Sequence, residues 1–154
     1  MKLTSYCNRY PDDFSDENNL SLVVFLEWPN FKICFPGDME NAGWKRLLDR
    51  ADFVEAMAGV TVLVASHHGR KNGCSEELFN LTEFRPQLIV ISDDNVQYKT
   101  QETVQWYSSK VQSQGVKLNG QMRKVLTTRS DGQIDFSISP SGISVDIGNA
   151  NALA

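Results

Sequence analysis

Two short motifs carry the side chains in this chain that could do chemistry. Pro36-Gly37-Asp38 supplies a carboxylate, and Ser66-His67-His68-Gly69 supplies two adjacent imidazoles. The 154 residues contain only these two histidines. Carboxylate oxygens and imidazole nitrogens are ligands that zinc and manganese accept in hydrolytic sites. The combination therefore predicts a metal site, or the remnant of one, with Asp38, His67 and His68 as its candidate ligands.

Each motif follows an apolar run that is typical of a buried β-strand. Residues 31–35 precede the aspartate motif, and residues 60–65 precede the histidine motif. Strand ends in α/β proteins are where rigid backbone meets open loops, and sites are built there. We therefore expect Asp38 and the two histidines to meet at one edge of a sheet.

The rest of the chain alternates between strand and helix patterns. Residues 21–28 and 31–35 predict a hairpin, and Leu88 to Ile91 predicts another buried strand. Trp44, Leu47 and Leu48 recur at helical spacing and predict one helix from Glu40 to about Phe53. Further helices are expected after Ser75 and around residues 104–111. The tail predicts a β-meander in which Asp131-Gly132 is a hairpin turn.

Composition indicates one globular domain of the α/β class, a mixed β-sheet with flanking helices. We expect an N-terminal loop over residues 1–18, the domain over 19–148 and a disordered tail over 149–154. The formal net charge of −4 argues against general nucleic-acid binding. No apolar stretch is long enough for a membrane span, no signal peptide is evident, and the three cysteines lack metal-ligand spacing. These features favour a cytoplasmic protein with reduced thiols.

The ordered set of motifs from Asn19 to Ile138 resembles the C-terminal half of a metallo-β-lactamase-fold domain. It is most similar to the branch found in the competence DNA-uptake protein. The motifs that carry the resemblance are Gly37-Asp38, Ser66-His67-His68-Gly69, Pro86-Gln87-Leu88-Ile89-Val90-Ile91-Ser92 and Thr128-Arg129-Ser130-Asp131-Gly132-Gln133-Ile134. The resemblance implies one half of an αββα sandwich.

The resemblance also implies roles for individual residues. Asp38 matches an aspartate that bridges two metal ions, and either His67 or His68 matches the last histidine ligand. The implied activity is zinc- or manganese-dependent hydrolysis of a phosphodiester, with nucleic acid as a possible substrate. Arg70, which stands where the family has serine, and Lys71 are candidates for binding the substrate phosphate.

The chain departs from the family pattern in its ligands. The family's His-x-His-x-Asp-His signature is absent, as is a further histidine before Gly37-Asp38. We therefore expect an incomplete metal site and little activity in the isolated chain. Two alternatives stay open: a non-catalytic binding or assembly module, and one chain of a split hydrolase.

A half-sandwich would also expose one apolar sheet face, to which Val23, Phe25 and Ile33 are expected to contribute. A homodimer or a partner chain would then cover that face. Ordinary structural roles are also alternatives to the proposed site roles. Asp38 could cap the following helix. Asp93 and Asp94 could approach the site from the end of the next strand, but a turn is the favoured role for them.

Overall fold

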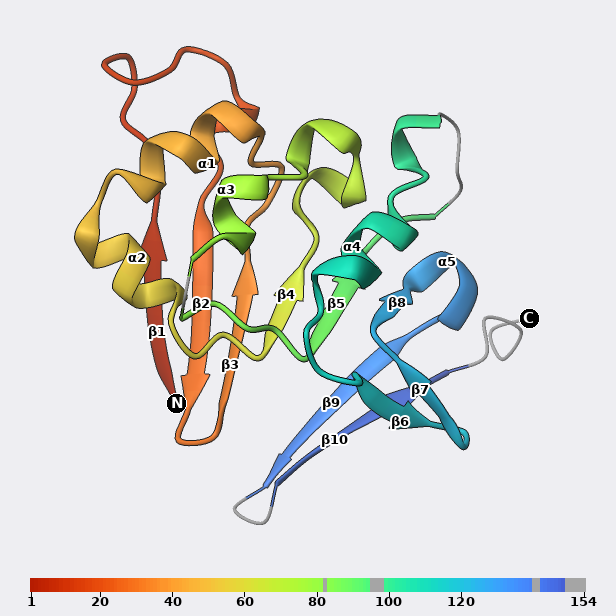
Figure 1. Ribbon diagram of the computed structural model, residues 1–154. Coiled ribbons are helices and arrows are strands. Elements are labelled where there is room, and N and C mark those ends of the chain that lie inside the picture. The colour runs from red at the N-terminus through yellow and green to blue at the C-terminus, as the bar shows by residue number, and fades with distance from the viewer. Residues whose placement is uncertain (82, 95–98, 140–141, 149–154) are drawn as a thin grey trace.

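A six-stranded mixed sheet in the order β1-β2-β3-β4-β5-β8 forms the centre of the computed structural model (Figure 1), which describes residues 1–81, 83–94, 99–139 and 142–148. Antiparallel pairing joins β1 to β2 and β2 to β3, whereas β3, β4, β5 and β8 run parallel. The strands are β1 (Lys2–Tyr6), β2 (Val23–Trp28), β3 (Phe31–Phe35), β4 (Val62–Val64), β5 (Leu88–Ile91) and β8 (Val125–Thr127). The α/β class with a mixed sheet is confirmed.

Helices cover one face of this sheet. They are α1 (Asn41–Leu48), α2 (Ala51–Met57), α3 (Glu76–Phe79) and α4 (Val104–Lys110). Trp44 and Phe53 from the helices pack with Phe25, Leu63 and Ile89 from the strands in the larger hydrophobic core. Each of these five side chains is at most 2 % exposed. Short 3₁₀ turns complete this side: η1 (Asn18–Leu20), η2 (Ser66–Gly69), η3 (Lys71–Gly73) and η4 (Lys99–Gln101).

The single helix expected from Glu40 to Phe53 is two helices in the structure. The chain leaves helical geometry at Arg50, whose φ of −99° and ψ of 117° are extended. The apolar spacing runs on across the break because both helices bury the same side against the sheet, and spacing alone therefore does not reveal it. The cap expected at Ser75 is confirmed, since its Oγ accepts a hydrogen bond from the Leu78 N–H at 3.3 Å.

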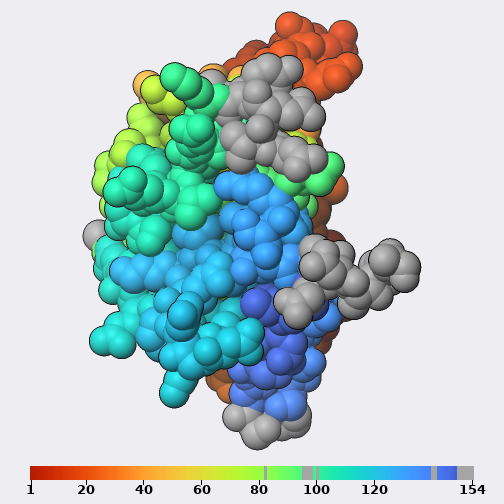
Figure 2. Space-filling model, turned by 90° about the vertical axis from the view of Figure 1, so that its right-hand side faces the viewer, coloured from red at the N-terminus to blue at the C-terminus, as the bar shows by residue number. Residues whose placement is uncertain are grey.

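Two hairpins pack on the opposite face of the sheet. β6 (Val116–Leu118) pairs with β7 (Gln121–Arg123), and β9 (Ile134–Ser139) pairs with β10 (Gly142–Ile147). Figure 2 shows the two hairpins beside each other on one side of the molecule, where β6 contacts β10. Their apolar side chains cover a second core that includes Phe31, Ile33, Val62 and Leu88.

The turn expected at Asp131-Gly132 is not the turn of a hairpin. β8 joins the main sheet beside β5, and a short helix, α5 (Thr128–Asp131), separates it from β9. The Asp131 carboxylate accepts hydrogen bonds from the Thr127 N–H at 2.8 Å and from Arg123 at 3.0 Å. These bonds hold Asp131 in a helical corner, while Gly132 reverses the chain at a φ of +71°.

Residues 2–6, which were expected within an N-terminal loop, form the edge strand β1. One side of an edge strand is open to solvent and accepts polar residues. The sequence of this run is therefore too polar to be recognised as a strand. Tyr6 anchors the strand from the other side, with its ring 5.9 Å from that of Phe25 and 5.2 Å from that of Phe53. The tail expected over 149–154 lies outside the described residues.

The expectation that Val23, Phe25 and Ile33 form an exposed face is wrong. Val23 and Phe25 point into the helix-side core, and Ile33 lies under the hairpins; all three are at most 5 % exposed. An apolar patch does exist beyond the hairpins, on the face that Ile33 shares. It consists of Leu3 (63 % exposed) and Phe35 (38 %), with Leu22 (54 %) at the start of β2.

None of the helices in the described ranges combines the length and the apolar character that a membrane crossing would require.

Candidate functional site

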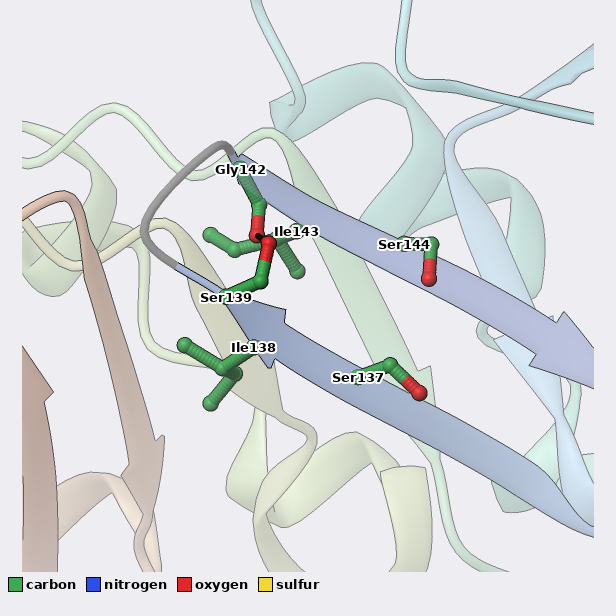
Figure 3. Close-up of a pocket in the computed structure, with 6 residues that line it drawn as sticks. All are labelled: Ser137, Ile138, Ser139, Gly142, Ile143 and Ser144. Atoms are coloured by element: carbon green, nitrogen blue, oxygen red, sulfur yellow. Dashed lines mark hydrogen bonds between the residues drawn. The ribbon is translucent and has the colours of Figure 1, made fainter.

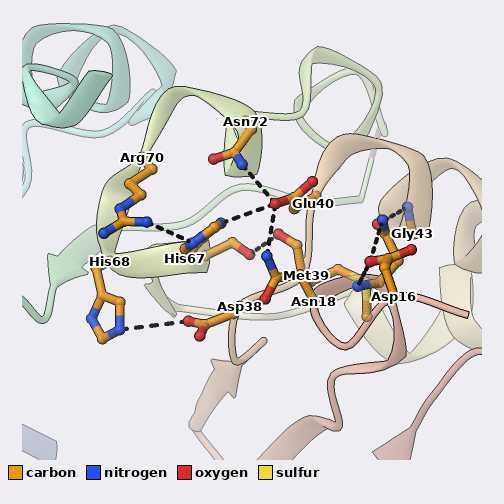
Figure 4. A network of polar contacts seen from close by, with 12 residues as sticks. Asp16, Asn18, Asp38, Met39, Glu40, Gly43, His67, His68, Arg70 and Asn72 are labelled. Carbon is orange, nitrogen blue, oxygen red and sulfur yellow. Dashed lines mark hydrogen bonds and ion pairs between the residues drawn. The ribbon is translucent and has the colours of Figure 1, made fainter. Parts of the chain in front are cut away.

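The carboxyl ends of β3 and β4 bring Asp38 and His68 together. The Asp38 Oδ1 and the His68 Nε2 are 3.6 Å apart (Figure 4). The Asp38 side chain is 46 % exposed and that of His68 is 54 % exposed, so both are open to solvent. The meeting of the aspartate and histidine motifs at one edge of the sheet is therefore confirmed.

A tight turn through Gly37 places Asp38. Gly37 has a φ of +61°, and a Cβ at this position would lie 3.1 Å from the Ser21 Cβ. The Asp38 N–H then donates a hydrogen bond to the Ser21 Oγ at 3.1 Å. The N-cap of α1 is Glu40, without a side-chain cap bond, so Asp38 does not serve as the cap of this helix. The Asp38 carboxylate is therefore available to bind a ligand.

A second turn, which is strained, places the histidines. His67 (φ 50°, ψ 48°), His68 (φ 53°, ψ 32°) and Gly69 (φ 71°) follow one another in left-handed geometry. Left-handed geometry costs a residue with a side chain about 1–2 kcal/mol. Such strain persists only where surrounding contacts enforce it, and it gathers at functional sites. Here the His67 N–H donates to the Gly37 carbonyl at 3.0 Å, and the Ser66 Oγ donates to the Met39 carbonyl.

Each ring nitrogen of His68 faces a different partner. Its Nδ1 lies 2.7 Å from the carbonyl oxygen of Ser92, at the end of β5. Because a carbonyl can only accept, this contact assigns the proton to Nδ1. The Nε2 therefore presents a lone pair toward the Asp38 carboxylate, which also presents lone pairs. Two such groups at 3.6 Å are satisfied together by a cation or a proton between them.

His67 has a different environment, although it is the next residue. Its side chain is only 10 % exposed, and its Nε2 lies 3.2 Å from an Arg70 guanidinium nitrogen, which donates to it. The Nδ1 then carries the proton and faces the Glu40 Oε1 at 3.4 Å, a contact longer than a well-formed hydrogen bond. That oxygen also accepts bonds from the amides of Asn18 (2.9 Å) and Asn72 (2.6 Å). Arg70 thus occupies the Nε2 of His67, whereas the buried Nδ1 has no hydrogen-bond partner among the described residues.

The two cationic candidates follow on the next turn of the chain. Arg70 is held beside His67 (Figure 4), and Lys71 begins η3 with an exposed side chain. Cys74 closes this loop, and its Sγ lies 3.6 Å from the Arg70 carbonyl. Burial raises the pKa of the Cys74 thiol, which keeps it from acting as a nucleophile.

Asp93 lies next to the site, in an environment that the sequence did not reveal. Asp93 was expected in a turn, but its side chain is 2 % exposed and forms an ion pair with Arg129 from α5. Burial raises the pKa of the Asp93 carboxyl, and the Arg129 charge opposes that rise. The acidic end of β5 was a signal for Asp93, whereas no pattern in the sequence pointed to Arg129. Asp94, in contrast, is exposed.

The Asp38–His68 pair fits a metal ion as two of its ligands. Two ligand atoms about 2.1 Å from a tetrahedral ion lie roughly 3.4 Å apart, close to the separation of these two atoms. The Nδ1–H bond to a carbonyl is the arrangement that metal-bound histidines usually have. Within the described residues, however, no three His, Cys, Asp or Glu side chains gather in a way that could hold a metal ion. The pair is therefore short of the three protein ligands of a catalytic zinc site.

A separate pocket lies at the tip of the β9–β10 hairpin (Figure 3). The described residues that line it are Ser137, Ile138, Ser139, Gly142, Ile143 and Ser144. None of these side chains is titratable, so this pocket offers no acid, base or metal ligand. The Asp38–His68 pair lies elsewhere, at the carboxyl edge of the sheet.

Comparison with protein-family models, with curated proteins and with solved structures gives no match for this chain. The resemblance to the metallo-β-lactamase fold therefore depends on the sequence motifs alone.

Proposed function

We propose that this chain is part of a metal-dependent hydrolase and binds one divalent ion, zinc or manganese, through Asp38 and His68. The observation that carries the proposal is the 3.6 Å approach of two electron-pair donors, the Asp38 Oδ1 and the His68 Nε2, at the carboxyl edge of the sheet. The open side of the ion would take its remaining ligands from another polypeptide. The protein is then one chain of a split hydrolase.

The proposed substrate class is a phosphodiester, and nucleic acid is one example. A divalent ion in such a site supplies a nucleophilic hydroxide and polarises a phosphoryl oxygen. The residues of this chain would hold the ion and orient the substrate. Arg70 and Lys71 lie on the turn after His68 and supply positive charge for the phosphate. With only two ligands, the isolated chain should hydrolyse little.

A partner would have a surface to bind beside this site. Phe35 ends β3 three residues before Asp38, and it belongs to the apolar patch with Leu3 and Leu22. A homodimer or a different chain that covers this patch would also approach the Asp38–His68 pair.

A non-catalytic binding or assembly module is the second candidate. It is favoured by the absence of a three-ligand cluster from the described residues and by the contact of His67 with Arg70, which occupies the Nε2 of that ring. In that case the pair would be a remnant with no metal affinity.

Isothermal titration of the purified chain with Zn²⁺ and Mn²⁺ tests the proposal. We expect weak binding of one ion per chain, lost in Asp38→Asn and in His68→Gln. His67→Gln is the matched control, since it makes the same chemical change one residue away and should retain the ion. Tight binding of two ions would contradict an incomplete site. No binding by the wild-type chain would favour the non-catalytic module.

Hydrolysis is measured on a chromogenic phosphodiester with the same variants. The isolated chain should show no turnover above that of the free metal ion. Turnover that disappears in His68→Gln would instead show that the chain carries a complete site by itself.

A further inference from the structure

We propose that Thr128 and Asp93 act as positioning residues that decide which ring nitrogen of His68 carries the proton. The inference deepens the proposed function and rests on it for its consequence, although its structural part can be tested without any metal. It concerns a single peptide unit, the one that joins Ser92 to Asp93 at the end of β5.

This peptide unit is bonded on both of its sides. The Asp93 N–H donates to the Thr128 Oγ1 at 2.8 Å. The Ser92 carbonyl, in the same unit, accepts from the His68 Nδ1 at 2.7 Å. A trans peptide holds its N–H and C=O on opposite sides of a rigid plane. Anchoring the N–H on Thr128 therefore aims the C=O at His68.

Two further contacts oppose rotation of this peptide. The Thr128 hydroxyl donates its own proton to the Asp93 carbonyl, so Thr128 is bonded to both backbone groups of Asp93. The Asp93 side chain, 2 % exposed, is ion-paired with Arg129, the residue after Thr128. The Thr128 hydroxyl and the Arg129 guanidinium, at the start of α5, thus both bind Asp93 at the end of β5.

The consequence is a choice of tautomer at His68. A carbonyl at Nδ1 selects the Nδ1–H form and leaves the Nε2 lone pair for a metal ion beside Asp38. If the peptide turned over, the Asp93 N–H would face Nδ1 instead. The proton would then move to Nε2, and the pair would lose its nitrogen donor. Thr128 therefore acts on the site through His68, without reaching the metal position.

Nitrogen-15 NMR of the histidine rings tests this proposal on the full chain without metal, at about pH 8, where an ordinary imidazole is neutral. In the wild type we expect His68 to be mainly the Nδ1–H tautomer. Thr128→Val keeps the shape of the side chain and removes both hydroxyl bonds, so the Nε2–H tautomer should become the major form. Thr128→Ser should restore the wild-type spectrum. His67 is the internal control, because its tautomer depends on Arg70 and should not change.

Metal titration of the same variants gives the functional consequence. Thr128→Val should weaken binding of Zn²⁺ by about 10-fold or more, the usual effect of losing an outer-shell partner, and Thr128→Ser should recover it. If Thr128→Val does not fold, Thr128→Ala removes the same hydroxyl from a smaller side chain. A folded hydroxyl-free variant that keeps His68 in the Nδ1–H form overturns the proposal. A tautomer change in a chain that binds no metal would instead reject the proposed function and keep the positioning role.

Discussion

His67 and His68 are adjacent, share a left-handed backbone and differ in almost everything else. The His67 ring is 10 % exposed and has a donor, Arg70, on one nitrogen and an acceptor, Glu40, on the other. The His68 ring is 54 % exposed and has acceptors on both sides, the Ser92 carbonyl and the Asp38 carboxylate. A ring between a donor and an acceptor needs no added ion, whereas a ring between two acceptors is satisfied only by a cation or a proton between it and one acceptor. The partners of the ring, more than its residue type, decide which histidine is available for a ligand.

The largest expected effect concerns the apolar patch of Leu3, Leu22 and Phe35, since Phe35 ends β3 three residues before Asp38. If a second copy of the chain covers this patch, light scattering should give twice the mass of one chain, because burying apolar side chains offsets the cost of association. Phe35→Asp should then give a monomer. Met122→Asp is the matched control, since Met122 is 48 % exposed but lies on β7. A monomeric wild type would leave a different partner as the occupant.

The next effect is a difference between the two histidines in how much their removal lowers the free energy of unfolding. His67→Ala should lower the free energy of unfolding by about 3 kcal/mol, because it removes two polar contacts and leaves Arg70 and Glu40 without their shared partner. His68→Ala should cost about 1 kcal/mol, since it loses one hydrogen bond from an exposed ring. Urea unfolding of both variants measures the difference. Equal losses would mean that the network around His67 is no more than a surface contact.

A smaller effect isolates the strain in the turn. Glycine adopts a φ of 53° without a steric penalty, so His68→Gly should be about 1 kcal/mol more stable than His68→Ala. Both variants lack the imidazole, so the comparison cancels the loss of the Ser92 contact. Thermal unfolding detects the gap. Alanine as stable as glycine would show that the turn relaxes out of left-handed geometry.

The smallest effect is a pH dependence away from both histidines. Hydrogen bonds from Lys110 and Trp106 hold the pKa of the Glu76 carboxyl below its ordinary value of 4.5. Because the folded pKa is depressed, this contribution to stability is present above pH 4.5 and is lost as the pH falls through the folded value. Glu76→Gln should therefore flatten the decline below pH 4.5, by less than about 1 kcal/mol because the carboxylate is 58 % exposed. An unchanged decline in stability would place the acid sensitivity elsewhere.

The sequence was sufficient to predict where the site lies, because it depends on strand ends. Apolar runs mark β3 and β4, and parallel pairing brings their ends together, so the meeting of Asp38 with the histidines followed from local patterns. The choice between His67 and His68 did not, because it depends on contacts distant in sequence. Ser92, 24 residues after His68, and Glu40, 27 residues before His67, decide it.

The fold shows the same division between local and long-range information. Amphipathic spacing predicted the regions of α1 to α4, and the apolar runs predicted β2 to β5, but the break between α1 and α2 and the polar strand β1 were missed. The pairing of β8 with β5 was missed because Asp131-Gly132 has the composition of a hairpin turn, while the bonds from Arg123 and Thr127 to Asp131 make it a helical corner. The burial of Ile33 was missed for a related reason. It depends on hairpins that begin more than 80 residues later in the chain.

The hydrogen bond from the His67 N–H to the Gly37 carbonyl joins the aspartate turn to the histidine turn through backbone atoms alone. This bond fixes the position of one loop relative to the other. A protein engineer who wished to transplant the Asp38–His68 pair to another scaffold would have to carry both strand ends and this bond together. Either loop alone would carry its side chain but would lack the contact that orients it.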